Sequence, residues 1–385
     1  MIEKALSGSP KYWALIFFWL VFMGLGAFAF LGQYQDGLQV TGLSRDVPWG
    51  FYIAQLTFLV GIAASAVMVV LPYYLHDYKA FGKLAILGEF LAIPAVLMCM
   101  LFVLVDMGQT ARIANMFIYI TPNSVMFWDA SVLMGYLGLN IVISQVTFGA
   151  ERKGIAPPKW IRPIIILSIP WAVSIHTVTA FLYSGHAARP FWMSAILAPR
   201  FLASAFAAGP ALLILLCLVV RKQTKYDPGM KALHKLSEIV AYAMAASVFF
   251  ILLEIFTVFY SGIPEHIHHF QYMYMGIDGK AALAPWMWTS SVLAIVALVL
   301  LLVPRYRKSR MGLPIACVAT IASLWIEKGM SLVVAGFVPN PLGQVIEYMP
   351  TGQELMISFG IYAFGGLVLT VLYKVAISVR EGLQG

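Results

Sequence analysis

Three charged side chains lie in the short stretch from 106 to 131, between two apolar segments. Asp106 ends one apolar run, Arg112 follows six residues later, and Asp129 lies near the start of the next run. Ionisable groups at the edge of a membrane are costly and mark functional sites by default. A carboxyl group there can accept a proton from a reacting group. The stretch therefore predicts a polar reactive site, with a purely structural charge cluster as the alternative.

Other ionisable residues lie inside apolar runs, where each needs a partner or a function. The complete set is Glu89, Asp106, Asp129, His176, Glu254, Glu327 and Lys328. Glu327 and Lys328 are adjacent and point about 100° apart on a helix, so each needs a partner on another helix. A structural ion pair and a functional role are equally open for them. His176 is either a packed histidine or a functional one.

Histidine and cysteine usage limits the cofactors that this chain can hold. A membrane haem b needs two histidines facing each other from separate spans, and only His176 lies well inside an apolar run. The cysteines Cys99, Cys217 and Cys317 form no C-x-x-C pair, which argues against an iron–sulfur cluster or a metal site. The "EHIHHF" segment (265–270) suits either a metal site or, more simply, a surface for a partner. We expect no intrinsic haem, iron–sulfur cluster or metal.

The elements that position these residues are membrane helices. The 385 residues are 61% hydrophobic and 11% charged, against about 25% charged in soluble domains. Backbone groups in lipid must be satisfied within the segment, so apolar runs of about 20 residues predict helices. We predict a single all-α integral membrane domain over 1–385. Its ten spans are 12–32, 50–72, 84–105, 125–147, 162–183, 200–220, 237–260, 286–304, 313–335 and 356–378.

The basic residues predict the orientation of the spans. With the amino terminus in the cytoplasm, nineteen of the 25 Lys and Arg residues fall in cytoplasmic segments, five in outer segments and Lys328 inside a span. So strong a bias predicts a multi-pass protein of the cell membrane with both termini cytoplasmic. The net charge of +8 is thus a topology signal and not a nucleic-acid signal. Six of the seven intramembrane ionisable residues then lie toward the outer face.

A polar pocket near one face of an aromatic-rich membrane chain suits a lipophilic ligand with a polar head. Aromatic residues make up 14% of the chain. A quinol fits best, because its ring and tail need apolar walls and its oxygens need hydrogen-bond partners. Its oxidation releases protons, which a carboxylate or histidine must accept. We expect Asp106 and His176 to have this catalytic role.

Four segments, in this order, resemble the motifs of the NrfD/polysulfide-reductase membrane-subunit family. They are "VPWGFYIAQLTFLVGIAASA" (47–66), "DMGQTAR" (106–112), "PNSVMFWD" (122–129) and "HTVTAFLYSGHAARPFWMSAILAPRFLASAFAAGPAL" (176–212). The second departs from the family's D-x-G-x-P-x-R pattern at Thr110. Within the family the chain looks most like the membrane subunit of the Dsr/Hme-type menaquinol-oxidising complex of sulfate-reducing organisms.

The resemblance implies an architecture and a site. It implies two four-helix bundles, 50–183 (spans two to five) and 200–335 (spans six to nine), with the first and tenth spans peripheral. It places a menaquinone or menaquinol near the outer face of the first bundle, beside an extracytoplasmic iron–sulfur subunit. A multihaem cytochrome c and further membrane or cytoplasmic subunits are additional candidate partners. The quinone-binding residues would be Gln55, Arg112, Trp128, Asp129, Tyr136 and Arg189.

Three functions stay open on the sequence. The favoured one is a quinol-reactive subunit of an anaerobic respiratory complex, not active alone, that exchanges electrons with a partner. The second is a proton or ion translocating module that uses Glu254, Glu327 and Lys328. The third is a passive membrane anchor for redox subunits.

Overall fold

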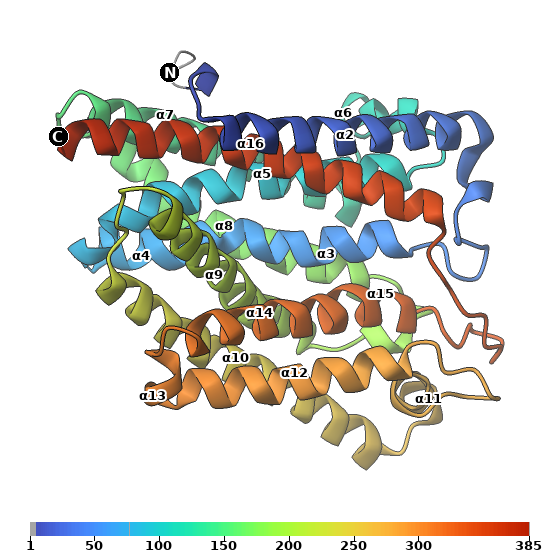
Figure 1. The fold of residues 1–385 in the computed structure, drawn as a ribbon. Helices are drawn as coiled ribbons and strands as arrows, with labels where there is room; N and C mark the ends of the chain where they lie inside the picture. The colour runs from blue at the N-terminus through green and yellow to red at the C-terminus, as the bar shows by residue number, and fades with distance from the viewer. Residues whose placement is uncertain (1–4, 77, 385) are drawn as a thin grey trace.

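The computed structural model describes residues 5–76 and 78–384 as helices joined by short connections (Figure 1). In this part of the chain, ten helices are long and apolar enough to cross a membrane. The same residues contain no strand, only an isolated bridge between Ile277 and Lys280. The predicted all-α class and the ten predicted spans are confirmed.

The ten spans follow the chain in order. They are α2 (Pro10–Asp36), α3 with α4 (Phe51–Leu75), α5 (Gly82–Asp106), α7 (Val125–Arg152), α8 (Ile161–Ser184), α9 (Leu197–Gln223), α10 (Met230–Ser261), α12 (Ala284–Leu302), α14 with α15 (Gly312–Ala335) and α16 (Gly352–Gln384). Short helices lie in the connections: α6 (Asn115–Ile118), α11 (Pro264–Tyr274) and α13 (Pro304–Arg307). Several helices extend beyond the predicted runs, because a helix can continue past the apolar layer into polar surroundings.

Local signals explain several helix ends. Ser9 accepts a hydrogen bond from the Tyr12 N–H, and Pro10 occupies the first helical position of α2. Helix α10 ends at Gly262, which has a φ of 67°. This left-handed conformation strains residues that carry a Cβ, so glycine is suited to end the helix there.

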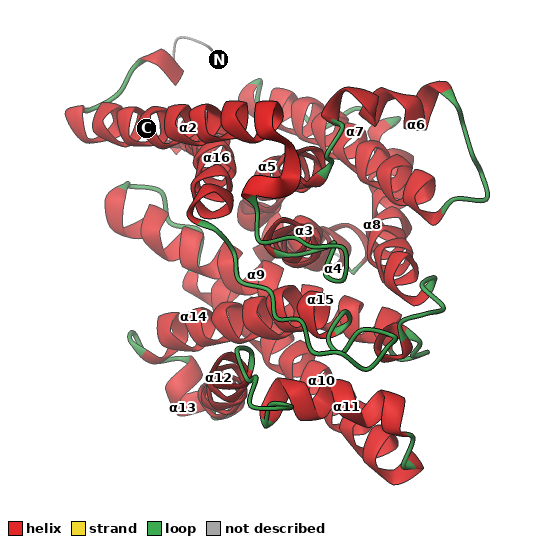
Figure 2. Cartoon of the chain, turned by 90° about the vertical axis from the view of Figure 1, so that its right-hand side faces the viewer, coloured by secondary structure: helices red, strands yellow, loops and turns green. Residues whose placement is uncertain are grey.

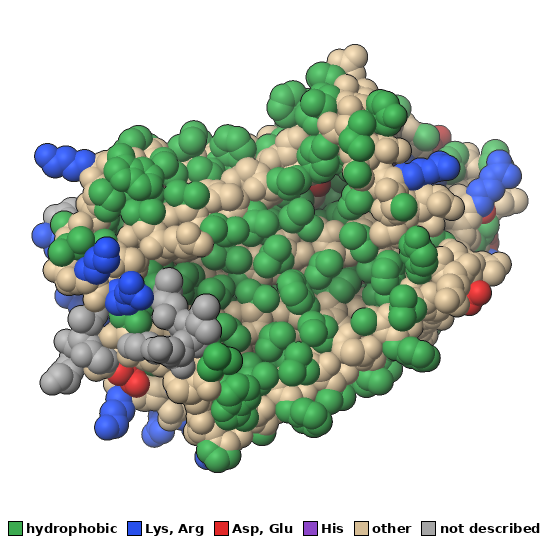
Figure 3. Space-filling model, turned by 90° about the horizontal axis from the view of Figure 1, so that it is seen from above, with side chains coloured by type: hydrophobic (Ala, Val, Ile, Leu, Met, Phe, Trp, Pro, Cys, Tyr) green, Lys and Arg blue, Asp and Glu red, His purple; other side chains and the backbone are tan. Residues whose placement is uncertain are grey.

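The connections divide the molecule into two ends. The loop-rich end holds 41–50, 107–124, 185–196, 262–283 and 336–351, and the basic end holds 153–160, 224–229 and 303–311. Helix α2 begins and α16 ends at the basic end (Figure 1). Hydrophobic side chains cover the middle of the face seen in Figure 3, and Lys and Arg lie toward its two ends. This distribution is that of a protein whose middle lies in lipid.

Helix α3 occupies the centre of the molecule, with α5, α8, α9 and α16 around it (Figure 2). Its residues are buried along nearly the whole span, whereas α2 is mostly exposed. Small residues allow the close approach of α9. A Cβ added at Gly209 would lie 3.0 Å from the carbonyl oxygen of Gly61 and 3.0 Å from the Cα of Ser65. Such small-residue contacts are typical of helix packing in membranes, where lipid removes the hydrophobic driving force between helices.

Two spans depart from regular α-helix. The second passes through a 3₁₀ turn, η2 (Ala64–Ala66), between α3 (Phe51–Ala63) and α4 (Val67–Leu75). The ninth contains a π-helical segment, η6 (Trp325–Ser331), between α14 (Gly312–Leu324) and α15 (Leu332–Ala335). π-helical turns occur frequently at functional sites.

The contacts between helices show which spans are neighbours, but they do not divide the spans into two independent bundles. Helix α3 packs on α5, and α7 packs on α5 and α8; α9 packs on α10 and α14, and α12 packs on α14. Helix α3 also contacts α9 and η6. Helices α16 and α2 lie side by side at the edge of the molecule (Figure 1). The division into bundles 50–183 and 200–335 stays a prediction.

Candidate functional site

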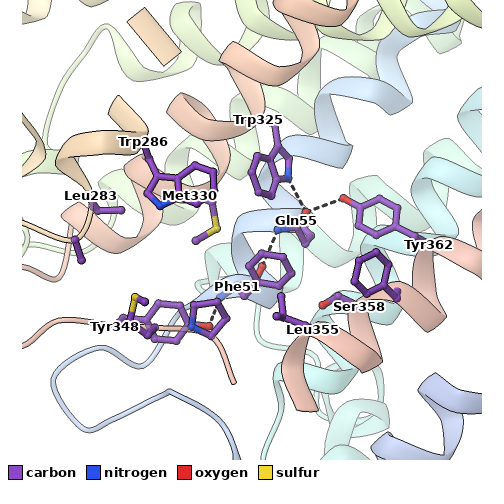
Figure 4. Close-up of a pocket in the computed structure, with 14 residues that line it drawn as sticks. Phe51, Gln55, Leu283, Trp286, Trp325, Met330, Tyr348, Leu355, Ser358 and Tyr362 are labelled. Atoms are coloured by element: carbon purple, nitrogen blue, oxygen red, sulfur yellow. Dashed lines mark hydrogen bonds between the residues drawn. The ribbon is translucent and has the colours of Figure 1, made fainter. Parts of the chain in front are cut away.

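A cavity of about 540 Å³ lies near the loop-rich end. Its walls come from the start of α3, from η6, from the first half of α16, from the start of α12 and from the connection before α16 (Figure 4). The lining is dominated by aromatic and aliphatic side chains: Phe51, Leu283, Trp286, Trp325, Met330, Tyr348, Met349, Leu355, Phe359 and Tyr362. This size and lining are those of a small-molecule pocket.

Gln55 is the polar centre of the cavity and is fully buried. Its Oε1 accepts hydrogen bonds from the Trp325 indole nitrogen at 2.8 Å and from the Tyr362 hydroxyl at 2.7 Å (Figure 4). The Trp325 N–H can only donate, so it fixes which end of the amide is the oxygen. Its Nε2 donates to the Phe51 carbonyl at 3.3 Å, which uses one of two N–H groups. The second N–H is left for a ligand oxygen.

Ser358 supplies a second polar atom to this wall. Its Oγ is buried and has no hydrogen-bond partner among the described residues. Unpaired buried hydroxyls are costly, so such an atom in a cavity wall suits a ligand with a polar group. Gln55 and Ser358 thus give an otherwise apolar cavity two points of polar recognition.

The cavity reaches the surface of the molecule. Trp286 on α12 is 53% exposed and Phe359 on α16 is 59% exposed, and both line the cavity. An apolar ligand could therefore enter sideways from the membrane, between α12 and α16.

Tyr348 forms the wall nearest the loop-rich end. Its hydroxyl accepts the Phe51 N–H at 2.7 Å and donates to Glu354 Oε1 at 2.5 Å. Burial, and then the neighbouring Glu354 carboxylate, raise the pKa of the Tyr348 phenol. The phenol therefore stays protonated and acts as a hydrogen-bond donor.

The two predicted catalytic residues lie apart from each other. Asp106 ends α5 and is partly buried; its Oδ1 has no hydrogen-bond partner among the described residues, and Glu354 is within electrostatic range. His176 on α8 is fully buried, and neither ring nitrogen has a hydrogen-bond partner in the described chain. Neither side chain lines the cavity.

Asp129 and Tyr136 lie inside the group formed by α3, α5, α7 and α8. Asp129 accepts a hydrogen bond from the Thr179 hydroxyl at 2.6 Å, which joins α7 to α8. Tyr136 donates to the carbonyl oxygen of Ala63 at 3.3 Å. Both are buried, and both are satisfied by neighbouring helices.

The other predicted quinone-binding residues lie at the loop-rich surface. Arg112 is exposed, and Trp128 donates to the Pro122 carbonyl at 2.7 Å and is 49% exposed. The Arg189 guanidinium lies 4.5 Å from the Phe337 ring. Partial burial, and then Arg189, lower the pKa of His186 nearby. Of the predicted quinone-binding residues, Gln55 alone lines the cavity.

The residues predicted for a proton pathway form a charged cluster with a third partner. Arg200 pairs with both Glu254 and Glu327 and so joins α9, α10 and η6. Lys328 donates to the Phe201 carbonyl at 3.3 Å, and its ammonium lies 4.4 Å from the Phe201 ring. The ion-pair interpretation of Glu327 therefore has a definite partner, Arg200, which lies at the edge of the predicted span 200–220.

The histidines of "EHIHHF" do not gather around one point. His269 is buried, and its Nδ1 lies 2.7 Å from the Ala335 carbonyl and 3.0 Å from the Val338 carbonyl. His268, its neighbour on α11, is exposed. Within 5–76 and 78–384, no three His, Cys, Asp or Glu residues are grouped so that they could hold a metal ion.

Comparison with known families decides the affiliation. Residues 39–338 match the family described as polysulphide reductase, NrfD. The chain belongs to the NrfD family.

Three relatives of this NrfD-family chain are named as subunits of reductases or of an oxidoreductase. A protein of Halobacterium salinarum, provisionally named as a dimethyl sulfoxide reductase membrane subunit, is 24% identical over 93% of this chain and 89% of its own. The Hdr-like menaquinol oxidoreductase integral membrane subunit of Archaeoglobus fulgidus is 26% identical over 66% of this chain and 62% of its own. A selenate reductase subunit of Mesobacillus selenatarsenatis is 22% identical over 75% of this chain and 74% of its own.

The sequence analysis missed most of the cavity. Trp325, Ser358, Tyr362 and the Tyr348–Glu354 pair were not selected, because they lie in or before the last two spans, outside the family motifs that directed attention to the first bundle. One signal was available: Gln55 lies among apolar residues and needs donors from other helices. Which helices supply those donors depends on side-to-side packing, which spacing along one chain does not encode.

Proposed function

We propose that this chain is the membrane subunit of an oxidoreductase complex and that it binds a quinone or quinol in the cavity beside Gln55. The observation that carries the proposal is the cavity itself: aromatic walls, a mouth toward lipid and two polar groups with unused hydrogen-bonding capacity. Quinones dissolve in the bilayer, so a sideways entrance gives them direct access. When bound, the ligand supplies two-electron chemistry coupled to protons.

The walls match such a ligand in polarity. Trp286, Trp325 and Phe359 can pack on an aromatic ring, and offset or edge contacts between rings contribute about 0.5–1.5 kcal/mol each. The free N–H of Gln55 can donate to a ring oxygen, and the Ser358 hydroxyl can donate or accept. These two groups would orient the ring, while the apolar walls would supply most of the affinity.

The relatives supply the setting of the proposal. One of them is named as a subunit of a menaquinol oxidoreductase, and we extend this to the present chain. We propose menaquinol as the ligand, quinol oxidation as the direction, and an iron–sulfur or haem centre on a partner subunit as electron acceptor. The loop-rich end would face that partner outside the cytoplasm, with both termini in the cytoplasm of a cell whose cytoplasmic membrane holds the complex.

A photoreactive naphthoquinone tests where the ligand binds. The complex would be purified through this chain, reconstituted in lipid nanodiscs, labelled with an azido-naphthoquinone and analysed by peptide mass spectrometry. We expect labels on 325–330 and 352–362, and we expect excess menadione to remove them. Labels confined to 125–184 would place the ligand inside the predicted first bundle and contradict the cavity.

A cavity-filling variant sharpens the same test. Ser358→Leu adds apolar volume where the ligand would lie, so labelling should disappear while the protein stays folded. Thr257→Leu, at an exposed position on α10, is the matched control and should label normally. No displaceable labelling in wild type would favour the passive-anchor function.

The alternative function, proton or ion translocation, would use the charged cluster and not the cavity. Arg200, Glu254, Glu327 and Lys328 are charged residues buried among the membrane helices, and buried charges there frequently serve ion or proton paths. Both glutamates are already paired with Arg200, so a structural role accounts for this arrangement as well. Proton uptake into sealed vesicles that contain the complex, beyond the protons that the quinol reaction itself exchanges and lost in Lys328→Met, would favour translocation.

A further inference from the structure

A carboxylate without a cation lies directly behind the cavity wall. Glu354, in the first turn of α16, is fully buried. Its carboxylate accepts three hydrogen bonds: from the Tyr348 hydroxyl at 2.5 Å, from the Gly42 N–H at 2.7 Å and from the Thr351 N–H at 2.8 Å. No ion pair resolved in residues 5–76 and 78–384 includes it.

The two carboxylate oxygens have different surroundings. Oε2 accepts both backbone N–H groups, and the Glu354 N–H lies 3.3 Å from the Thr351 Oγ1. Thr351 and Glu354 therefore form a capping box at the start of α16, which is the structural explanation of this glutamate. Oε1 takes no part in the cap and meets only the Tyr348 hydroxyl. The cap explains the hydrogen bonds of Oε2. It does not explain the contact of Oε1 with Tyr348.

Tyr348 connects this second oxygen to the cavity. Its ring lines the cavity opposite Gln55 and Tyr362 (Figure 4), and its hydroxyl oxygen is fixed by the Phe51 N–H at 2.7 Å. A phenol that donates to a carboxylate can pass on its proton and take another at the same oxygen. A hydrogen-bonded route thus leads from the cavity wall to a buried proton acceptor.

Two further polar groups interact with Glu354 over a longer range. Asp106 and Tyr52 both lie within electrostatic range of Glu354. The Tyr52 hydroxyl donates to Gln33 Oε1 at 2.7 Å, and Asp106 keeps one buried oxygen without a partner in the described chain. The residues that follow Asp106, Gly108 and Gln109, are exposed. Asp106, at the end of α5, is therefore close to the loop-rich surface.

We propose that Tyr348 and Glu354 exchange the proton of the ligand in the cavity, with Asp106 as the next acceptor toward the loop-rich end. This inference rests on the proposed function. In quinol oxidation, the ligand O–H bond breaks and its proton binds the Tyr348 oxygen, while the Tyr348 hydroxyl proton binds the Glu354 carboxylate. The two electrons go to the iron–sulfur or haem centre of the partner subunit. A second proton follows the same path once Glu354 has released the first, and quinone reduction reverses each step.

The roles differ between the two residues. Tyr348 would touch the ligand and is the catalytic residue of the pair, whereas Glu354 acts through Tyr348 and sets the proton affinity of the route. This division predicts that ligand binding and proton exchange can be separated by mutation. Glu354→Gln is suited to do so, since glutamine also completes a capping box but cannot take up a proton.

The test uses the whole complex in lipid nanodiscs, with menadione and menadiol as probes. For Glu354→Gln we expect unchanged menadione affinity, and loss of the carboxylic-acid band in redox-induced infrared difference spectra. Menadiol-dependent reduction of the partner's redox centre should fall about a hundredfold, a typical size for general acid–base catalysis. Glu354→Asp, which keeps a titratable carboxyl, should restore part of the rate, and Tyr348→Phe should lower the rate to an extent similar to Glu354→Gln.

Glu347→Gln is the matched control. Glu347 also accepts from a backbone N–H, that of Ala282 at 2.8 Å, and from a tyrosine, Tyr272 at 3.3 Å, but it does not line the cavity. It should leave the rate and the infrared band unchanged. If Glu354→Gln keeps both as well, Glu354 is a helix cap and the inference is overturned while the cavity stands. If wild type does not bind menadione, the cavity assignment itself is overturned, and this inference with it.

Discussion

The Gln55 side-chain oxygen lies 2.8 Å from the indole nitrogen of Trp325, which joins the central helix α3 to the π-helical segment η6. Tyr362 of α16 donates to the same oxygen at 2.7 Å. One buried amide therefore joins the second span to the ninth and tenth spans. The segment η6 also carries Glu327 and Lys328, so the cavity and the charged cluster share one irregular turn.

Removal of this amide should weaken ligand binding. Gln55→Leu keeps the volume but leaves the Trp325 N–H and the Tyr362 hydroxyl without their acceptor, and each orphaned buried donor costs about 1–3 kcal/mol. The free N–H that would contact a ligand is lost as well. We expect menadione affinity, measured by tryptophan fluorescence quenching in nanodiscs, to fall about tenfold, equivalent to about 1.4 kcal/mol.

The control for this change is Gln353→Leu. Gln353 is also a glutamine in a helix–helix contact, where it donates to the Ala29 carbonyl at 2.9 Å, but it does not line the cavity. Its loss should leave menadione binding at the wild-type level. Equal losses in both variants would show that the cavity responds only to general destabilisation.

The sequence was sufficient to predict the ten spans, because runs such as 84–105 and 200–220 are long, apolar and bounded by polar segments. The sequence was not sufficient to predict which helices pack side by side. Helix α16 is at the periphery, as predicted, yet it contributes Ser358, Phe359 and Tyr362 to the cavity. Side-to-side packing depends on the shapes of facing surfaces, which hydropathy does not record.

Part of the candidate site was within reach of sequence reasoning. Gln55 was selected, and Glu327 was expected to need a partner on another helix. That partner, Arg200, lies at the edge of the predicted span 200–220, and the helix that holds it begins at Leu197. The π-helical turn that presents Trp325 to the cavity has no such signal, because nothing in "WIEKGMS" distinguishes it from regular helix.

Helices α2 and α16 should separate when a methyl group is added at their crossing. A Cβ at Gly26 would lie 2.5 Å from the Cα of Gly360, and backbone cannot move aside as a side chain can. Overpacking of this kind costs about 1–3 kcal/mol. We expect Gly26→Ala to lower the thermal unfolding midpoint in detergent. Gly24→Ala is the control two residues away, where a Cβ meets nothing within 4 Å, and an equal decrease there would refute the crossing.

Protonation of His269 should destabilise the loop-rich end. Burial lowers the pKa of this histidine, and the backbone carbonyls of Ala335 and Val338 offset part of the effect. The unfolded chain therefore binds a proton more readily, and stability falls as pH drops below about 6.5, the ordinary histidine value. This contribution is fully present at higher pH and is lost toward the lower, folded-state pKa.

The measurement is the unfolding midpoint between pH 7.5 and pH 5 in wild type and His269→Asn, which keeps a donor at the δ position. The variant should lose less stability on acidification than wild type. His268→Asn, an exposed neighbour on the same helix, should follow wild type. Parallel curves for all three proteins would show that other groups control the acid response.

Arg200 should contribute strongly to the stability of the second half of the chain, because it neutralises two buried carboxylates. Arg200→Met leaves Glu254 and Glu327 without their cation, and breaking a buried pair in this way costs about 3–5 kcal/mol. The triple variant Arg200→Met with Glu254→Gln and Glu327→Gln removes all three charges and should recover much of that loss, as measured by chemical unfolding. Arg221→Met breaks the exposed pair with Asp227 and should cost no more than about 1 kcal/mol.

Because the cluster anchors η6, we also expect Arg200→Met, but not the triple variant, to weaken menadione binding through displacement of Trp325 and Met330. Unchanged stability in Arg200→Met would mean that the cluster is not an ion-pair network.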